Sequence, residues 1–285
     1  MWILLSLLSA LTVSLSDLMA KIYMKELDPE NIALVRFLSS GLFFVPLIII
    51  NIKKILHISL ESIPYLAILT PLEIIAFTLY SKAINTTHIS LVMPITALSP
   101  LLVAIVSMIM IEEYPSILGA IGIILVTLGG ITIYGPKSSR KKENLKGIIA
   151  MVTATLIYAI TTTLGKICVI LVDPFSFAII YYPIIGTSFL LLRTVTKGKS
   201  CTFRDIKALK NKYVLLSGFL LTVSIITHFL AISMTNASYM IALKRISLLF
   251  SVILGHYILK ETEFKNRLFG SLLMIIGLFF ISMAK

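Results

Sequence analysis

Charged side chains are scarce in this sequence. Asp, Glu, Lys and Arg make up 13% of the 285 residues, whereas a soluble domain carries roughly a quarter. Hydrophobic residues reach 58% and the mean hydropathy is +1.01, which excludes an ordinary water-soluble fold. A helix needs about 20 residues to cross a bilayer, so the chain has room for ten spans with short loops. Little is left for a soluble domain.

Acidic residues and cysteines are also few. There are 13 acidic residues against 25 basic ones, giving a net charge of +12. The basic residues stand in short stretches between apolar runs, where they favour membrane orientation and lipid contact over nucleic-acid binding. Cys168 and Cys201 are the only cysteines and form neither a disulfide framework nor a metal cluster. We expect the lipid bilayer and a small-molecule substrate as partners, with no nucleic acid, cofactor or metal, and leave homodimerisation open.

Signatures of catalysis are missing too. The sequence has no HExxH, no GxSxG and no Walker-type loop, and His57, His88, His228 and His256 are scattered. We therefore expect no enzyme activity. Without a nucleotide site, any transport would be driven by an ion or solute gradient rather than directly by ATP.

Apolar runs separated by Pro, Asn or charged residues predict an all-α integral membrane fold. The first run lacks a basic leader and a small-residue cleavage site, so we expect it to be a retained span. The expected helices cover 2–20, 32–50, 62–81, 89–111, 115–134, 147–170, 175–193, 212–232, 238–259 and 266–284.

The two halves of the sequence repeat each other. Shifting the first half by 145 residues aligns Lys21, Asp28, Pro29 and Gly41 with Lys166, Asp173, Pro174 and Gly186. Shifting it by 148 residues aligns the remaining helices through Tyr65/Tyr213, Ala83/Ala231, Ile84/Ile232, Thr87/Thr235, Ser90/Ser238, Ser99/Ser247, Glu113/Glu261, Gly122/Gly270 and Gly129/Gly277. We expect a first five-helix repeat at 1–135, a basic linker at 136–146 and a second repeat at 147–285. Because five is odd, the repeats should be inverted, as alternating access requires.

Two long stretches carry a family resemblance. They are SKAINTTHISLVMPITALSPLLVAIVSMIMIEE, followed by Gly122 and Gly129, and ISMTNASYMIALKRISLLFSVILGHYILKE, followed by Gly270 and Gly277. The chain resembles the EamA-type branch of the drug/metabolite transporter superfamily over nearly its whole length. The resemblance implies ten helices, a central cavity lined mainly by the third, fourth, eighth and ninth, and export or exchange of small organic solutes. It does not specify the solute.

Lys244 and Arg245 are the leading candidate site. They lie six and seven residues into an expected helix, and an ionised side chain deep in the bilayer costs roughly 2.5 to 3.5 kcal/mol. The first repeat has Thr96 and Ala97 there, so the site is asymmetric and suited to an anion. Relatives that carry sugar phosphates are similar in placing a Lys-Arg pair on this helix. Adjacent residues point about 100° apart, so we expect one to face the cavity and the other to pair with an acid or a helix end. The alternative is snorkelling or a structural ion pair.

Glu73 is the most central acidic residue. It follows Pro71, which removes a backbone donor and is expected to open the helix locally. Glu73 would act as a proton-coupling carboxylate or as a counter-ion for Lys244 or Arg245, or would pair only structurally. Tyr80 and His228 occupy equivalent repeat positions and, with Thr96, are candidates for hydrogen bonds to a substrate, although such residues often make only interhelical contacts.

Other polar residues are assigned to the scaffold. Asp17 and Lys21 are four residues apart and can pair locally; they and Arg36 are expected to anchor helices at the interface. The Asp28-Pro29 and Asp173-Pro174 pairs predict helix starts, and Glu113 and Glu261 lie at helix junctions. The paired glycines near each repeat's end predict close helix packing.

We expect a multi-pass protein of the cell membrane that carries a small anionic metabolite by alternating access. The alternatives are a flippase for a lipid-linked headgroup, recognisable by a lateral opening, and a non-transporting subunit or receptor, whose charges should be sealed into ion pairs. Most basic loop residues lie on the face that the positive-inside rule assigns to the cytoplasm, with both termini outside; family members are usually drawn with cytoplasmic termini. The orientation therefore stays open.

Overall fold

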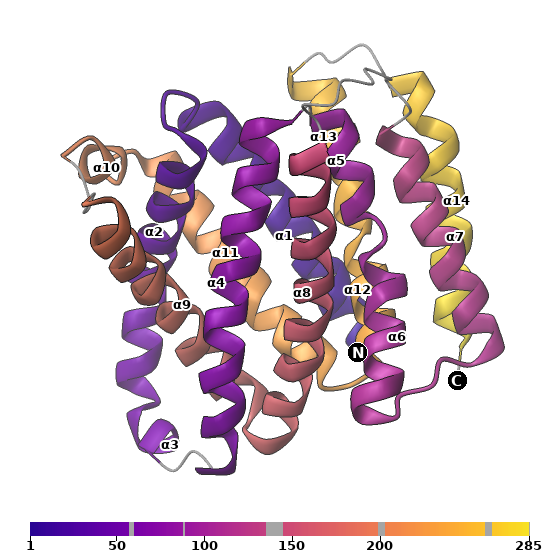
Figure 1. Ribbon diagram of the computed structural model, residues 1–285, viewed down its shortest axis with the longest axis horizontal. Coiled ribbons are helices and arrows are strands. Elements are labelled where there is room, and N and C mark those ends of the chain that lie inside the picture. The colour runs from indigo at the N-terminus through magenta and orange to yellow at the C-terminus, as the bar shows by residue number, and fades with distance from the viewer. Residues whose placement is uncertain (57–59, 88, 135–144, 199–202, 260–263, 285) are drawn as a thin grey trace.

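The computed structural model describes residues 1–56, 60–87, 89–134, 145–198, 203–259 and 264–284, and in these ranges every regular element is a helix. In chain order the elements are α1 Trp2–Tyr23, α2 Pro29–Ile50, α3 Ile52–Leu56, η1 Leu60–Ser62, α4 Ile63–Thr86, α5 Ile89–Thr96, α6 Ser99–Ile111, α7 Ile117–Tyr134, α8 Leu145–Leu171, α9 Pro174–Lys197, α10 Phe203–Ala208, α11 Lys212–Ile232, α12 Ala237–Lys244, α13 Ile246–Leu259 and α14 Phe264–Met283. They form one bundle with both chain ends on the same side (Figure 1).

Seven segments of the described chain are long and apolar enough to cross a membrane, as a hydrocarbon core of roughly 30 Å requires. Two shorter apolar helices, Ile117–Ile133 and Phe269–Met283, accompany them. The chain is therefore a multi-span membrane protein. The seven segments are Trp2–Tyr23, Glu30–Ile50, Ile63–Thr86, Leu91–Ile111, Leu145–Leu171, Pro174–Val195 and Lys212–Ile232.

The expected continuous helix 89–111 is broken between α5 and α6. The Ala97 N–H bonds to the Pro94 carbonyl at 3.2 Å and the Leu98 N–H to the Ile95 carbonyl at 3.1 Å, so the chain tightens into 3₁₀-type turns. Pro100, in the first turn of α6, has no N–H to continue the α-helical ladder. The break has a local sequence cause that the apolar run concealed.

The expected helix 238–259 is broken at the same repeat position. α12 ends at Lys244 and α13 begins at Ile246, and the 148-residue shift places Arg245 on Ala97. No proline lies at this second break; instead the Leu248 N–H bonds to the Arg245 carbonyl at 2.9 Å. The Arg245 side chain bonds to Ser99 of α6, so tertiary contact accompanies the break.

Pro71 does not interrupt α4, contrary to expectation: the helix runs from Ile63 to Thr86 with Pro71 inside it. The helix starts predicted from the two Asp-Pro pairs agree with the structure. Pro29 and Pro174 each begin a helix, and the Asp173 carboxylate accepts a hydrogen bond from the Ser176 N–H at 2.9 Å. The Asp28 side chain makes no such capping bond.

Helix contacts between the two halves are reciprocal. α1 packs along α11 just as α8 packs along α4, and α2 contacts α11 just as α9 contacts α4. α6 contacts α8 just as α13 contacts α1, while α7 packs with α14 and α2 with α9. Each contact maps onto another, or onto itself, when the halves are exchanged, so the bundle has pseudo-two-fold symmetry.

Serine pairs join α1 to α11. Ser9 bonds to Ser224, with 3.1 Å between the hydroxyls and 2.8 Å from Ser9 Oγ to the Ser224 carbonyl oxygen. Ser16 and Ser217 repeat the arrangement one heptad away. Small polar residues let helices approach closely in lipid and satisfy one another's hydrogen bonds.

Paired glycines hold α7 against α14 at one edge of the bundle (Figure 1). A Cβ atom on Gly122 would lie 2.6 Å from the Gly277 carbonyl oxygen, and one on Gly129 would lie 2.5 Å from that of Gly270. The predicted close packing is thus confirmed. Glu261, Cys201, His57, His88 and most of the 136–146 linker lie outside the described residues.

Candidate functional site

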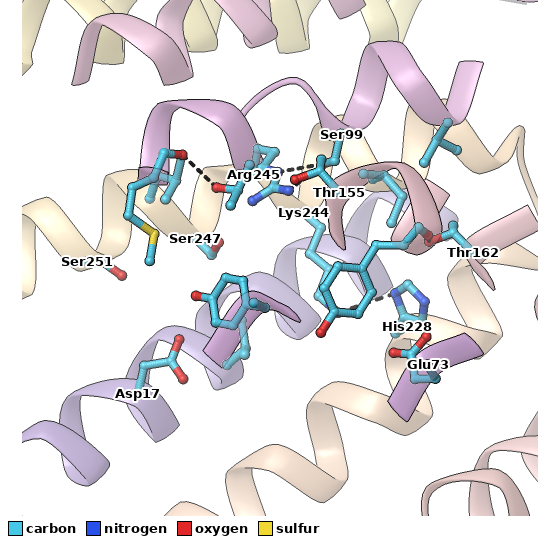
Figure 2. Close-up of a pocket in the computed structure, with 18 residues that line it drawn as sticks. Asp17, Glu73, Ser99, Thr155, Thr162, His228, Lys244, Arg245, Ser247 and Ser251 are labelled. Atoms are coloured by element: carbon cyan, nitrogen blue, oxygen red, sulfur yellow. Dashed lines mark hydrogen bonds between the residues drawn. The ribbon is translucent and has the colours of Figure 1, made fainter. Parts of the chain in front are cut away.

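A cavity of about 560 Å³ lies between the two halves (Figure 2). The six residues singled out from the sequence all line it: Glu73, Tyr80, Thr96, His228, Lys244 and Arg245. The rest of its wall consists of Val13, Asp17, Met93, Ser99, Val103, Thr155, Tyr158, Thr162, Ile241, Ser247, Leu248 and Ser251.

Most of this wall is built from repeat-related pairs, so the cavity lies on the pseudo-two-fold axis. The pairs are Val13/Tyr158, Asp17/Thr162, Tyr80/His228, Met93/Ile241, Thr96/Lys244, Ser99/Ser247 and Val103/Ser251. Some pairs differ in charge: the repeat partner of Asp17 is Thr162, and that of Lys244 is Thr96. A symmetric scaffold therefore carries a chemically asymmetric wall.

Arg245 bonds to the other broken helix at the cavity wall. Its Nε donates to Ser99 Oγ at 3.1 Å, and its Nη2 also contacts that hydroxyl. Ser99 begins α6 and Arg245 follows the last residue of α12, so the bond joins the two helix breaks. This contact fixes the guanidinium group beside the cavity.

Lys244 lines the same cavity, whereas we expected only one of the two cations to face it squarely. The helix α12 ends at Lys244 and its C-cap residue Arg245 keeps a helical backbone conformation, and both side chains line the cavity. Lys244 Nζ lies 3.3 Å from His228 Nδ1 (Figure 2). The imidazole is thus placed to accept a hydrogen bond from the ammonium group.

Thr96 and Tyr80 occupy the opposite, first-repeat part of the wall. The Thr96 hydroxyl donates to the Met93 carbonyl at 2.7 Å within its own helix. The Tyr80 ring meets the Tyr158 ring edge-on at a centroid distance of 6.5 Å. Both hydroxyls lie at the cavity wall, and their roles in binding stay predictions.

A second cavity of about 370 Å³ adjoins the first. The two share Val13, Asp17, Glu73, Tyr158, His228 and Lys244. Aromatic side chains make up much of the rest of the second wall: Phe37, Phe77, Tyr181, Tyr182 and Phe229. The first cavity is thus rich in hydroxyl groups and cations, and the second is rich in rings.

Asp17 and Arg36 form an ion pair at 2.8 Å, and Arg36 Nη2 also donates to Ser16 Oγ at 3.1 Å. Asp17 lines both cavities and Arg36 the second, whereas the sequence had suggested interfacial anchoring. No sequence feature set Asp17 apart as a cavity residue, because its repeat partner Thr162 was itself not a candidate. The repeat register did align Ser99 with Ser247, and both line the cavity.

Polar contacts join the halves at the α6–α7 turn. Glu113 forms an ion pair with Lys166, whose side chain is largely buried, and accepts a hydrogen bond from the Ala237 N–H at 2.9 Å. Asn236 Nδ2 donates to the Tyr114 carbonyl at 3.3 Å. We call these contacts the interhalf clamp.

In the described ranges, no group of His, Cys, Asp and Glu side chains could hold a metal ion. The fold and cavity together define a class: multi-span membrane proteins built from two related halves around a polar cavity.

Comparison with known proteins narrows this class. The chain belongs to the EamA-like transporter family, which matches residues 1–135 and again residues 145–283. A solved crystal structure is similar to it with a TM-score of 0.81 and 12% identity, covering 99% of this chain and 96% of the other. That likeness concerns the fold alone. Among curated proteins, none matches this chain.

Proposed function

We propose that this protein is a secondary transporter that exports or exchanges a small organic anion across the cell membrane by alternating access. The observation that carries the proposal is the position of Lys244 and Arg245 at a cavity between the repeats. Charged groups within a membrane are retained mainly where they serve function. The bilayer and a small-molecule substrate are the partners that this function requires.

The proposed architecture has ten spans in two inverted repeats, at 1–135 and 147–285, joined by a linker. In it α5 and α6 form one broken span, and α12 and α13 form another. Figure 1 supports inversion, since α1 begins on the lower side of the bundle and α8 on the upper side. Broken helices at a central cavity are a recurring arrangement in secondary transporters.

Glu73 shares both cavities with Lys244. We assign it the role of coupling carboxylate, with that of counter-ion as the alternative. Tyr80, His228 and Thr96 would hydrogen-bond the substrate from the two repeats. A non-transporting subunit would be expected to seal its charges away from any cavity, so the two cavities favour transport over that alternative.

Ligand-dependent thermal stabilisation of the purified protein tests the binding part of this proposal, since a ligand that prefers the folded state raises the melting temperature. The panel contains carboxylates, phosphates, neutral solutes and amines, and the variants are Lys244→Gln and the matched control Lys82→Gln, whose side chain is exposed on α4. We expect an anionic hit that Lys244→Gln abolishes and Lys82→Gln preserves.

Transport itself is tested in proteoliposomes that contain the anionic hit. Uptake of the labelled anion that is lost in Lys244→Gln supports the function of a carrier. If the hits are cationic or neutral, or survive Lys244→Gln, the anionic site is wrong. Movement of a labelled anionic lipid between leaflets, without uptake of the soluble anion, would instead favour the flippase alternative.

A further inference from the structure

The two cavities meet at a charged boundary. Asp17, Glu73, His228 and Lys244 belong to both walls, so a molecule bound at Lys244 can extend into either space. The combined volume is within the range of pockets that enclose one small organic ligand, roughly 300 to 1,000 Å³. A single substrate could therefore occupy both.

The polar cavity is suited to an acidic headgroup. Lys244 and Arg245 supply cations, while Ser99, Ser247 and Ser251 supply hydroxyl groups. An anion placed there would exchange lost hydration for charge-assisted hydrogen bonds. The basic residues come from the second repeat, so they set the direction in which the headgroup points.

The aromatic cavity is suited to a ring. Phe37 meets Phe77 edge-on at a centroid distance of 6.2 Å and tilts against Tyr182 at 5.0 Å. Phe229 also lines this cavity. Such a wall offers both ring faces and ring edges, the two geometries that aromatic pairs prefer. A solute whose surface carries only hydroxyl groups would make no ring contacts with this wall, and its hydroxyl groups would lose water there without gaining new hydrogen bonds.

The charge balance points to a single negative charge. The cations of Arg36, Lys244 and Arg245 and the carboxylates of Asp17 and Glu73 line the two cavities, which leaves one positive charge in excess when all are ionised. The Asp17–Arg36 pair at 2.8 Å internally neutralises the aromatic side. The excess is thus centred near Lys244 and Arg245.

We propose that the substrate is an amphipathic monocarboxylate, with its carboxylate at Lys244 and Arg245 and an aromatic ring in the cavity lined by Phe37, Phe77 and Phe229. This inference rests on the proposed function and refines its substrate class. It makes Phe77 a specificity-determining residue, because Phe77 contacts the ring and not the headgroup.

Three probes test the proposal in the purified full chain. 3-Phenylpropionate carries both features, propionate lacks the ring, and 3-phenylpropionamide lacks the charge. We expect 3-phenylpropionate to bind at least about tenfold more tightly than either of the others, since a buried ring and a paired carboxylate each contribute about that factor. Affinity is measured by the concentration dependence of the melting temperature.

Two variants separate the ring from the headgroup. Phe77→Leu should weaken 3-phenylpropionate about tenfold and leave propionate unchanged, whereas Lys244→Gln should weaken both. The matched control is Phe279→Leu, which removes a ring from the exposed face of α14. Equal losses in Phe77→Leu and Phe279→Leu would mean that the ring partitions into lipid, and would overturn the proposal.

Failure of this inference differs from failure of the proposed function. If propionate or a sugar phosphate binds through Lys244 as tightly as 3-phenylpropionate, the aromatic class is wrong while the anion carrier stands. If no anion on the panel depends on Lys244, both are wrong.

Discussion

Lys166 of the second repeat forms an ion pair with Glu113 of the first, and the same carboxylate accepts a hydrogen bond from the Ala237 N–H. Alternating access requires contacts between the halves to form on one side of the cavity and break on the other. The interhalf clamp is one such contact, because it ties the α6–α7 turn to the start of α12. Its rupture should change the access to the cavity.

A cysteine introduced at the cavity by Ser247→Cys can report access through its reaction with a membrane-impermeant thiol reagent. Adding Glu113→Gln to this variant is expected to increase the rate of that reaction several-fold. The background replaces Cys168 and Cys201. The increase should occur from one side of proteoliposomes only, because only one end of the cavity is released. Glu112→Gln is the control: it removes the same charge from the neighbouring exposed residue. Unchanged labelling in Glu113→Gln would show that the clamp is structural.

The ion pair between Asp17 and Arg36 predicts a charge effect on anion affinity. Arg36→Gln leaves the Asp17 carboxylate at the cavities without its cation, so anions should bind about tenfold more weakly through repulsion. The double variant Asp17→Asn with Arg36→Gln should recover most of the lost affinity. A double variant that binds as weakly as Arg36→Gln would mean that Arg36 contacts the substrate directly.

Glycine substitutions should separate packing from helix propensity. Gly122→Ala places a Cβ 2.6 Å from the Gly277 carbonyl oxygen, and such overpacking typically costs about 1 to 3 kcal/mol. The melting temperature should fall. Gly41→Ala is the matched control, because no atom lies within 4 Å of its added Cβ and alanine favours the helix by about 1 kcal/mol. A similar loss in both variants would contradict the close packing of α7 against α14.

The membrane class could be predicted because long apolar runs and the scarcity of charged residues are visible in the sequence itself. The repeat could be predicted because matching residues recur in both halves at nearly constant offsets. Lys244, Arg245 and Glu73 were noticed because ionisable residues in apolar runs are rare, and the structure gathers them at one cavity; their roles in binding stay predictions. The break at Arg245 could not be predicted, since it has no proline and forms against Ser99 of a distant helix.

Aromatic residues were harder to interpret than charges. Phe37, Phe77 and Tyr182 look like any other apolar residues of a span, and only the packing of three helices brings them to one wall. Lys166 was recognised as a repeat marker, but its bond to Glu113 joins residues more than 50 positions apart. The hydrophobic periodicity and the composition of the helices carry no information about such contacts between distant residues.

Glu73→Gln should distinguish coupling from charge balance. If Glu73 is the coupling carboxylate, the variant loses accumulation driven by a pH gradient but keeps the exchange of labelled for unlabelled anion, because exchange needs no net proton movement. If Glu73 is only a counter-ion of Lys244, accumulation persists and the anion binds more tightly, since a competing negative charge has gone. Both activities are measured in the same proteoliposomes, with Glu112→Gln as the control for loss of an acidic residue. We expect the first outcome, because Glu73 lies at the boundary shared by both cavities, where a proton on its carboxylate would remove a negative charge beside the bound anion and so couple proton binding to anion binding.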